Sequence, residues 1–70
     1  MRGFVEVYWA TSSRAGVVTI PLEEFRGMSS IDIMYHMSAR AAAQAKARVR
    51  LSMDVGAVVS KIETELAEGQ

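Results

Sequence analysis

The side chains that could support acid–base or metal chemistry in this 70-residue chain centre on its single histidine, His36. Asp32 lies four residues before it and Arg40 four residues after it, a spacing that places side chains on one face of a helix. Such a face could combine an orienting carboxylate, an imidazole base and a cation. We favour the simpler interpretation, in which Asp32 caps the helix and the other two form an ordinary surface pair.

Composition excludes several other kinds of site. The chain has no Cys, so it has no thiol nucleophile, thiolate metal site or disulfide. With one His, a multi-histidine metal centre cannot form within one chain, and Asp32 with His36 supplies two ligands at best. The five glycines are scattered and form no phosphate-binding motif. We therefore expect no catalytic residues, no metal and no cofactor.

Positive charge gathers in one segment, although 8 Lys and Arg residues balance 8 Asp and Glu residues overall. Residues 29–53 contain four cations and only Asp32 as an acid, whereas residues 54–70 contain four acids and only Lys61 as a cation. Clustered cations on a helix could neutralise the phosphates of a nucleic acid, and the candidate contacts are Arg40, Lys46, Arg48 and Arg50. The pI near 6.6 favours a solvated face or a match between a basic and an acidic helix.

Residues 4–9, Phe-Val-Glu-Val-Tyr-Trp, are typical of a strand. Because side chains alternate across a sheet, Val5, Val7 and Trp9 share one face, and Phe4 and Tyr8 lie on the other. Two short helices cover only one face of a hairpin, which leaves an apolar face for a second copy, another protein or a single-stranded nucleic acid. The candidate partner or oligomer interface is Phe4, Tyr8 and Trp9, with Trp9 either capping the core or centring an oligomer contact.

An antiparallel hairpin is expected to position these aromatic residues. A turn cluster at residues 11–16 separates the first strand from a second strand at residues 17–20. Pro21 ends that strand, because proline cannot donate to a sheet ladder. Residues 21–26 are then expected to form a short helical turn with acidic residues at its start.

Two amphipathic helices are predicted next. Ser29 and Asp32 form a capping box at the start of the first helix. Projection at about 100° per residue assigns its apolar face to Ile31, Met34, Tyr35, Ser38, Ala41, Ala42, Ala45 and Val49. The second helix is capped by Ser52 or Asp54 and ends before Gly69. Its apolar residues at helical spacing are Val55, Val58, Val59, Ile62 and Leu66.

Residues 47–53 fit two structures. They alternate apolar and polar side chains, which is a strand pattern. They also continue the first helix without any Gly or Pro that would stop it. The helical interpretation, which we favour, gives a hairpin followed by two helices (ββαα), and the strand interpretation gives ββαβα with a third strand at about residues 47–53.

Residues 16–21, Gly-Val-Val-Thr-Ile-Pro, resemble the Gly-x-Val-x-Ile-Pro segment of the AbrB-type swapped-hairpin transcription factors. In that family a short helix follows the proline. The resemblance covers eleven residues, 16–26. The chain then departs from the family, which continues with a further strand pair where this sequence has an Ala-rich helix. The resemblance implies a strand-swapped, dimeric DNA-binding protein.

The sequence therefore predicts one small α+β domain over residues 1–70. Chains of this length usually need a disulfide, a metal or a partner chain, so we expect a homo-oligomer. The predicted function is a non-enzymatic interaction module that binds another protein, and the alternative is a small dimeric DNA-binding regulator with a basic helix face. No segment has the apolar length of a membrane span or a secretory signal, so a cytoplasmic protein is expected. The Ala-, Arg- and Val-rich composition suits a bacterial or phage gene.

Overall fold

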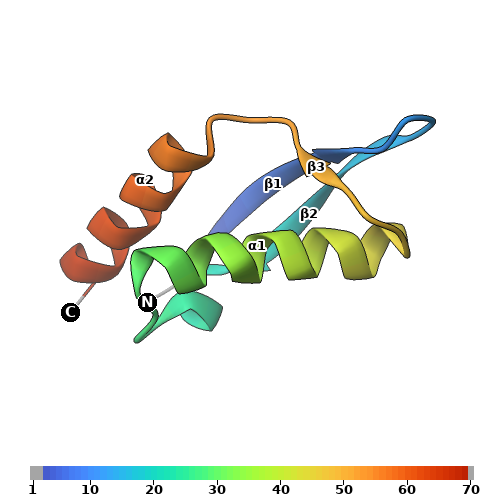
Figure 1. Ribbon diagram of the computed structural model, residues 1–70. Helices are drawn as coiled ribbons and strands as arrows, with labels where there is room; N and C mark the ends of the chain where they lie inside the picture. The colour runs from blue at the N-terminus through green and yellow to red at the C-terminus, as the bar shows by residue number, and fades with distance from the viewer. Residues whose placement is uncertain (1–2, 70) are drawn as a thin grey trace.

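The computed structural model describes residues 3–69 and has the predicted α+β fold (Figure 1). Over these residues the elements in chain order are β1 (Phe4–Ala10), β2 (Ala15–Pro21), the 3₁₀ helix η1 (Leu22–Phe25), α1 (Ser30–Ala45), β3 (Arg50–Leu51) and α2 (Val55–Glu68). The N-terminal hairpin, the short helical turn after it and the two longer helices are therefore confirmed.

β1 is the central strand of the sheet, because β2 pairs with one of its edges and β3 with the other. Both pairings are antiparallel, and Trp9 of β1 lies opposite Gly16 of β2 and Leu51 of β3. The hairpin turn is closed by Thr11, whose backbone N–H donates to the Arg14 carbonyl at 2.7 Å. The Thr11 hydroxyl accepts from the Arg14 N–H at 2.9 Å. Two hydrogen bonds of opposite direction therefore join Thr11 and Arg14 across the turn.

α1 packs across one face of the sheet (Figure 1). Ser29 caps α1 by accepting from the Asp32 N–H, and Asp54 caps α2 by accepting from the Ala57 N–H, so both predicted caps form. No polar or charged side chain is buried among residues 3–69. The buried hydrophobic side chains of this part of the chain are Val5, Val7, Trp9, Val18, Ile20, Leu22, Phe25, Ile33, Met37, Ala41, Ala45, Val59 and Ile62.

The predicted apolar face of α1 is wrong in its N-terminal half. Ile31, Met34 and Tyr35 are exposed, whereas Ile33 and Met37 are fully buried together with Ala41 and Ala45 further along the helix. The buried row follows i, i+4 spacing and needs only one side chain per turn. The rotation of α1 is set by contacts with η1 that no helical projection contains.

Two polar contacts and one ring contact show how η1 holds α1. Glu24 accepts from Arg40 at 3.0 Å and lies 2.8 Å from the Nε2 atom of His36. The His36 ring also meets the Phe25 ring edge to face, with centroids 5.3 Å apart. Because His36 and Arg40 turn towards η1, Ile33 and Met37 turn towards the sheet.

Residues 47–53 do not continue α1, which corrects the favoured helical interpretation and supports the alternative ββαβα order. Lys46 adopts the left-handed conformation (φ 56°, ψ 39°), and this stops the helix without Gly or Pro. The Nη2 atom of Arg14 donates to the Ala45 carbonyl at 2.7 Å, so the hairpin turn satisfies an acceptor that a longer helix would have used. Arg50 then pairs with Ala10 and forms the short strand β3.

Within residues 3–69 no helix combines the length and the hydropathy that crossing a bilayer requires.

Candidate functional site

One face of the sheet is not covered by α1, and we call it the open face. Strand alternation and register place on it Phe4, Glu6, Tyr8 and Ala10 of β1, Ala15, Val17 and Thr19 of β2, and Arg50 of β3. Phe4 is 68% exposed, Tyr8 48% and Val17 38%. Three large apolar side chains exposed on one sheet face form a candidate contact surface.

Trp9 lies on the opposite face and belongs to the core. It is 5% exposed, and its Nε1 atom donates to Gln44 of α1 at 2.6 Å. The Arg14 guanidinium covers its ring at 5.7 Å from the centroid. Of the three predicted interface residues, Phe4 and Tyr8 are therefore available at the surface of the protomer, and Trp9 is not.

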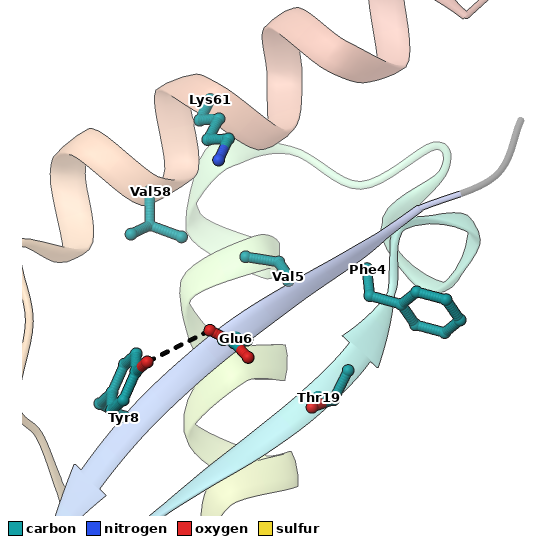
Figure 2. Close-up of a pocket in the computed structure, with 7 residues that line it drawn as sticks. All are labelled: Phe4, Val5, Glu6, Tyr8, Thr19, Val58 and Lys61. Atoms are coloured by element: carbon teal, nitrogen blue, oxygen red, sulfur yellow. Dashed lines mark hydrogen bonds between the residues drawn. The ribbon is translucent and has the colours of Figure 1, made fainter.

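A groove of about 550 Å³ is lined by residues of β1, by Thr19 of β2 and by Val58 and Lys61 of α2. Figure 2 shows Val58 and Lys61 of α2 directed towards β1, and the Tyr8 hydroxyl donating to Glu6 at 3.2 Å. This hydrogen bond, helped by the negative charge of Glu6, raises the pKa of Tyr8 above its ordinary value of 10.0. Phe4, Glu6, Tyr8 and Thr19 of the open face line this groove, so the groove is part of that face.

The outer edge of β2 is the longest free strand edge among residues 3–69. The Thr11 N–H donates to Arg14 and the Leu22 N–H to Gly3, both in the register of the hairpin. In an antiparallel ladder, hydrogen-bonded pairs occur at every second residue. The even-numbered residues of β2 therefore bond to β1, and the backbone groups of Ala15, Val17 and Thr19 point away from it. We call these three residues the free edge.

The four predicted nucleic-acid contacts separate into two places. Arg40 lies beside η1 and is paired with Glu24, so it does not belong with the other three. Lys46 and Arg48 lie in the segment between α1 and β3, and Arg50 begins β3. The structure adds Arg14 of the hairpin turn, which donates to the Ala45 carbonyl at the end of α1. We call Arg14, Lys46, Arg48 and Arg50 the basic end. All four side chains are exposed, and no carboxylate of residues 3–69 pairs with them.

Asp32, His36 and Arg40 do not form a three-residue site. Asp32 is exposed and takes part in the cap of α1, as expected, while His36 and Arg40 share Glu24. Glu24 was missed because it lies in a different element, twelve residues before His36, where no helical spacing connects them. Within residues 3–69 no group of three or more His, Asp or Glu side chains is placed to hold a metal ion.

Comparisons with known proteins add no function to this geometry. No family model, curated protein or solved structure matches the chain. The resemblance of residues 16–26 to the swapped-hairpin transcription factors thus remains a local one, and the function has to be argued from the open face, the free edge and the basic end.

Proposed function

We propose that this chain is a small non-enzymatic interaction module that acts as a homo-oligomer, and that the first protein it binds is a second copy of itself. The observation that carries the proposal is the free edge of β2. Ala15, Val17 and Thr19 present unpaired backbone donors and acceptors to solvent, and an unpaired edge is a template for strand addition.

The sequence of β2 leaves this edge unprotected. Natural proteins usually block an edge strand with charged side chains, a bulge or an internal proline. β2 reads Ala-Gly-Val-Val-Thr-Ile-Pro and has no charged residue, and Pro21 stands at its far end, beyond the three outward-facing residues. A strand of seven residues with these features is suited to pair with another strand.

The free edge is complementary to itself. An antiparallel pair centred on Val17 sets Val17 against the partner's Val17, and Ala15 against the partner's Thr19, so each donor meets an acceptor. This pairing has a two-fold axis, and closed two-fold dimers are the commonest soluble homo-oligomers. It joins the two sheets into one and brings the exposed Val17 side chains together on the open face. A second copy is therefore the occupant that fits this edge.

The size of the chain supports the same proposal. A chain of about 60 residues buries only about 60% of its unfolded surface, and this chain has no disulfide to compensate. Pairing two edges adds backbone hydrogen bonds and buries apolar area without any change within the protomer.

Light-scattering mass measurements on single-residue variants test the proposal. We expect the wild-type chain to have twice its 7.7 kDa mass at tens of micromolar. Val17→Pro removes the central outward N–H, and Val17→Lys sets two like charges against each other across the pair. Both variants should have the single-chain mass and the wild-type circular dichroism spectrum.

Val17→Thr is the matched control, because it keeps the N–H and the β-branched shape and should retain the doubled mass. A wild-type mass of 7.7 kDa at these concentrations would contradict the proposal. So would a doubled mass in both the Val17→Pro and the Val17→Lys variant. Val17→Lys keeps the test decisive if the proline variant does not fold, because the Val17 side chain is solvent-exposed.

A further inference from the structure

The fold gathers at the basic end cations that lie far apart in the sequence. Arg14 comes from the hairpin turn, and its guanidinium reaches the carboxyl end of α1 at Ala45. Lys46, Arg48 and Arg50 follow that helix directly. Neither residues 10–15 nor residues 43–53 contain Asp or Glu, so this end of the molecule carries four positive charges with no acidic residue in either segment.

The acidic side chains of α2 do not neutralise these charges. Glu63 of α2 accepts from Ser30 at the other end of α1, at 2.5 Å, and Glu65 lies 3.9 Å from Lys61 of its own helix. The match between a basic and an acidic helix that the sequence allowed is therefore not formed among residues 3–69. Four exposed cations remain for an anionic partner.

An aromatic ring lies beside this charge on the open face. Arg50 pairs with Ala10, so its side chain leaves the sheet on the same face as Tyr8, which comes two residues before Ala10 in β1. The Ser52 N–H donates to the Tyr8 carbonyl at 2.9 Å, which carries the chain from β3 directly past Tyr8. A half-exposed ring and a guanidinium thus lie on one sheet face near the basic end.

We propose that the basic end binds single-stranded nucleic acid, with phosphates on Arg48 and Arg50 and a base stacked on Tyr8. A single strand offers the faces of its bases to an aromatic ring on a sheet, whereas a duplex keeps its bases stacked inside. Glu6, which accepts from Tyr8, repels phosphates and limits the site to the half of the open face nearest the hairpin turn. The site lies towards the β3 side of the sheet, so pairing of β2 edges leaves it free and the two proposals stand independently.

Fluorescence anisotropy with a labelled oligothymidylate tests this site. The wild-type chain should bind it, and the affinity should fall as salt concentration rises, with a slope in log–log form of about −0.7 for each phosphate contact. Arg50→Ala should weaken binding and flatten the slope by about 0.7. Tyr8→Leu should weaken binding about tenfold without changing the slope, because stacking releases no counterions. Tyr8→Phe keeps the ring and should bind as the wild type does.

Two surface variants are matched controls. Arg26→Ala removes an exposed arginine that directly follows η1, and Tyr35→Leu removes an exposed tyrosine from α1. Both should bind as the wild-type chain does. Absence of binding at low salt would overturn the proposal, as would an Arg26→Ala loss equal to that of Arg50→Ala. Equal affinity for a duplex of the same length, unaffected by Tyr8→Leu, would overturn the single-strand assignment.

Discussion

At the scale of single residues, the pair formed by Trp9 and Gly16 determines how the hairpin meets α1. The Trp9 ring lies over Gly16, where an added Cβ atom would stand 2.5 Å from Cζ2 and 2.8 Å from Cε2. The Trp9 ring is fixed in place, since its Nε1 atom donates a hydrogen bond to Gln44 and the Trp9 side chain is buried. Glycine at this position is a steric requirement of the core.

Gly16→Ala should therefore lower the free energy of unfolding by about 1–3 kcal/mol, the usual cost of overpacking. Gly56→Ala is the opposite case, because Gly56 lies in the first turn of α2 and an added Cβ atom would meet only an Asp54 oxygen at 3.7 Å. That change should raise the free energy of unfolding by about 0.5–1 kcal/mol. Urea unfolding of both variants measures the two changes in the free energy of unfolding, which should have opposite signs. Equal changes in the same direction would show that the packing of Trp9 against Gly16 is misassigned.

The hydrogen bond from Tyr8 to Glu6 predicts a pH effect on the open face. The pKa of Tyr8 is raised above 10.0, first by the hydrogen bond to Glu6 and then by the charge of Glu6. Its stabilising effect is complete below pH 10 and is lost as pH rises through the raised pKa. In a Tyr35→Phe background, tyrosinate absorbance should report this raised pKa, and Glu6→Gln should bring it back down towards 10. An unchanged titration curve after Glu6→Gln would contradict the contact.

At the scale of elements, α1 ends because Lys46 takes a left-handed conformation that non-glycine residues adopt at a cost. Lys46→Gly should raise the free energy of unfolding by about 0.5–1 kcal/mol, since glycine is the favoured residue at this position of a helix end. Thermal unfolding measures the change. A loss of stability would mean that α1 continues beyond Ala45 in solution and that β3 does not form.

The elements differ in how much of them the sequence could predict. The hairpin, its two faces, η1 and both caps follow from local signals such as the alternation before Thr11 and the Ser29 capping box. The end of α1 could not be predicted in this way, because it depends on a left-handed lysine and on Arg14 reaching Ala45 from the hairpin turn. The Arg14–Ala45 contact joins residues 31 positions apart, and no local pattern contains it.

The sequence likewise predicted some residues of the candidate surfaces and not others. Phe4 and Tyr8 were identified by strand alternation alone, and the structure exposes both. Trp9 belongs to the core because α1 covers its face of the sheet. Among the cations, Arg14 was missed and Arg40 was wrongly grouped, since the basic end is created by tertiary contacts while Arg40 is held by Glu24 in another element.

At the scale of the whole molecule, charge is separated along its length. The Cα trace extends over 40 × 19 × 15 Å. Arg14 lies at the carboxyl end of α1, and Glu63 contacts Ser30 at the amino end of the same helix. Cations near the carboxyl end of a helix and anions near its amino end both interact favourably with the helix dipole. Although the net charge of the chain is zero, one end of the molecule is therefore basic, and Tyr8 of the open face lies near that end.

The alternation of hydrogen bonds in β2 allows the most direct test of self-association. Amide hydrogen exchange, followed residue by residue by NMR at low and high protein concentration, separates the two edges of this strand. The Gly16, Val18 and Ile20 amides face β1 and should be protected at every concentration at which the chain is folded. The Ala15, Val17 and Thr19 amides face outwards and should be protected only at high concentration. Val17 exchange that is fast and independent of concentration, beside protected Val18, would contradict the dimer formed by the free edge.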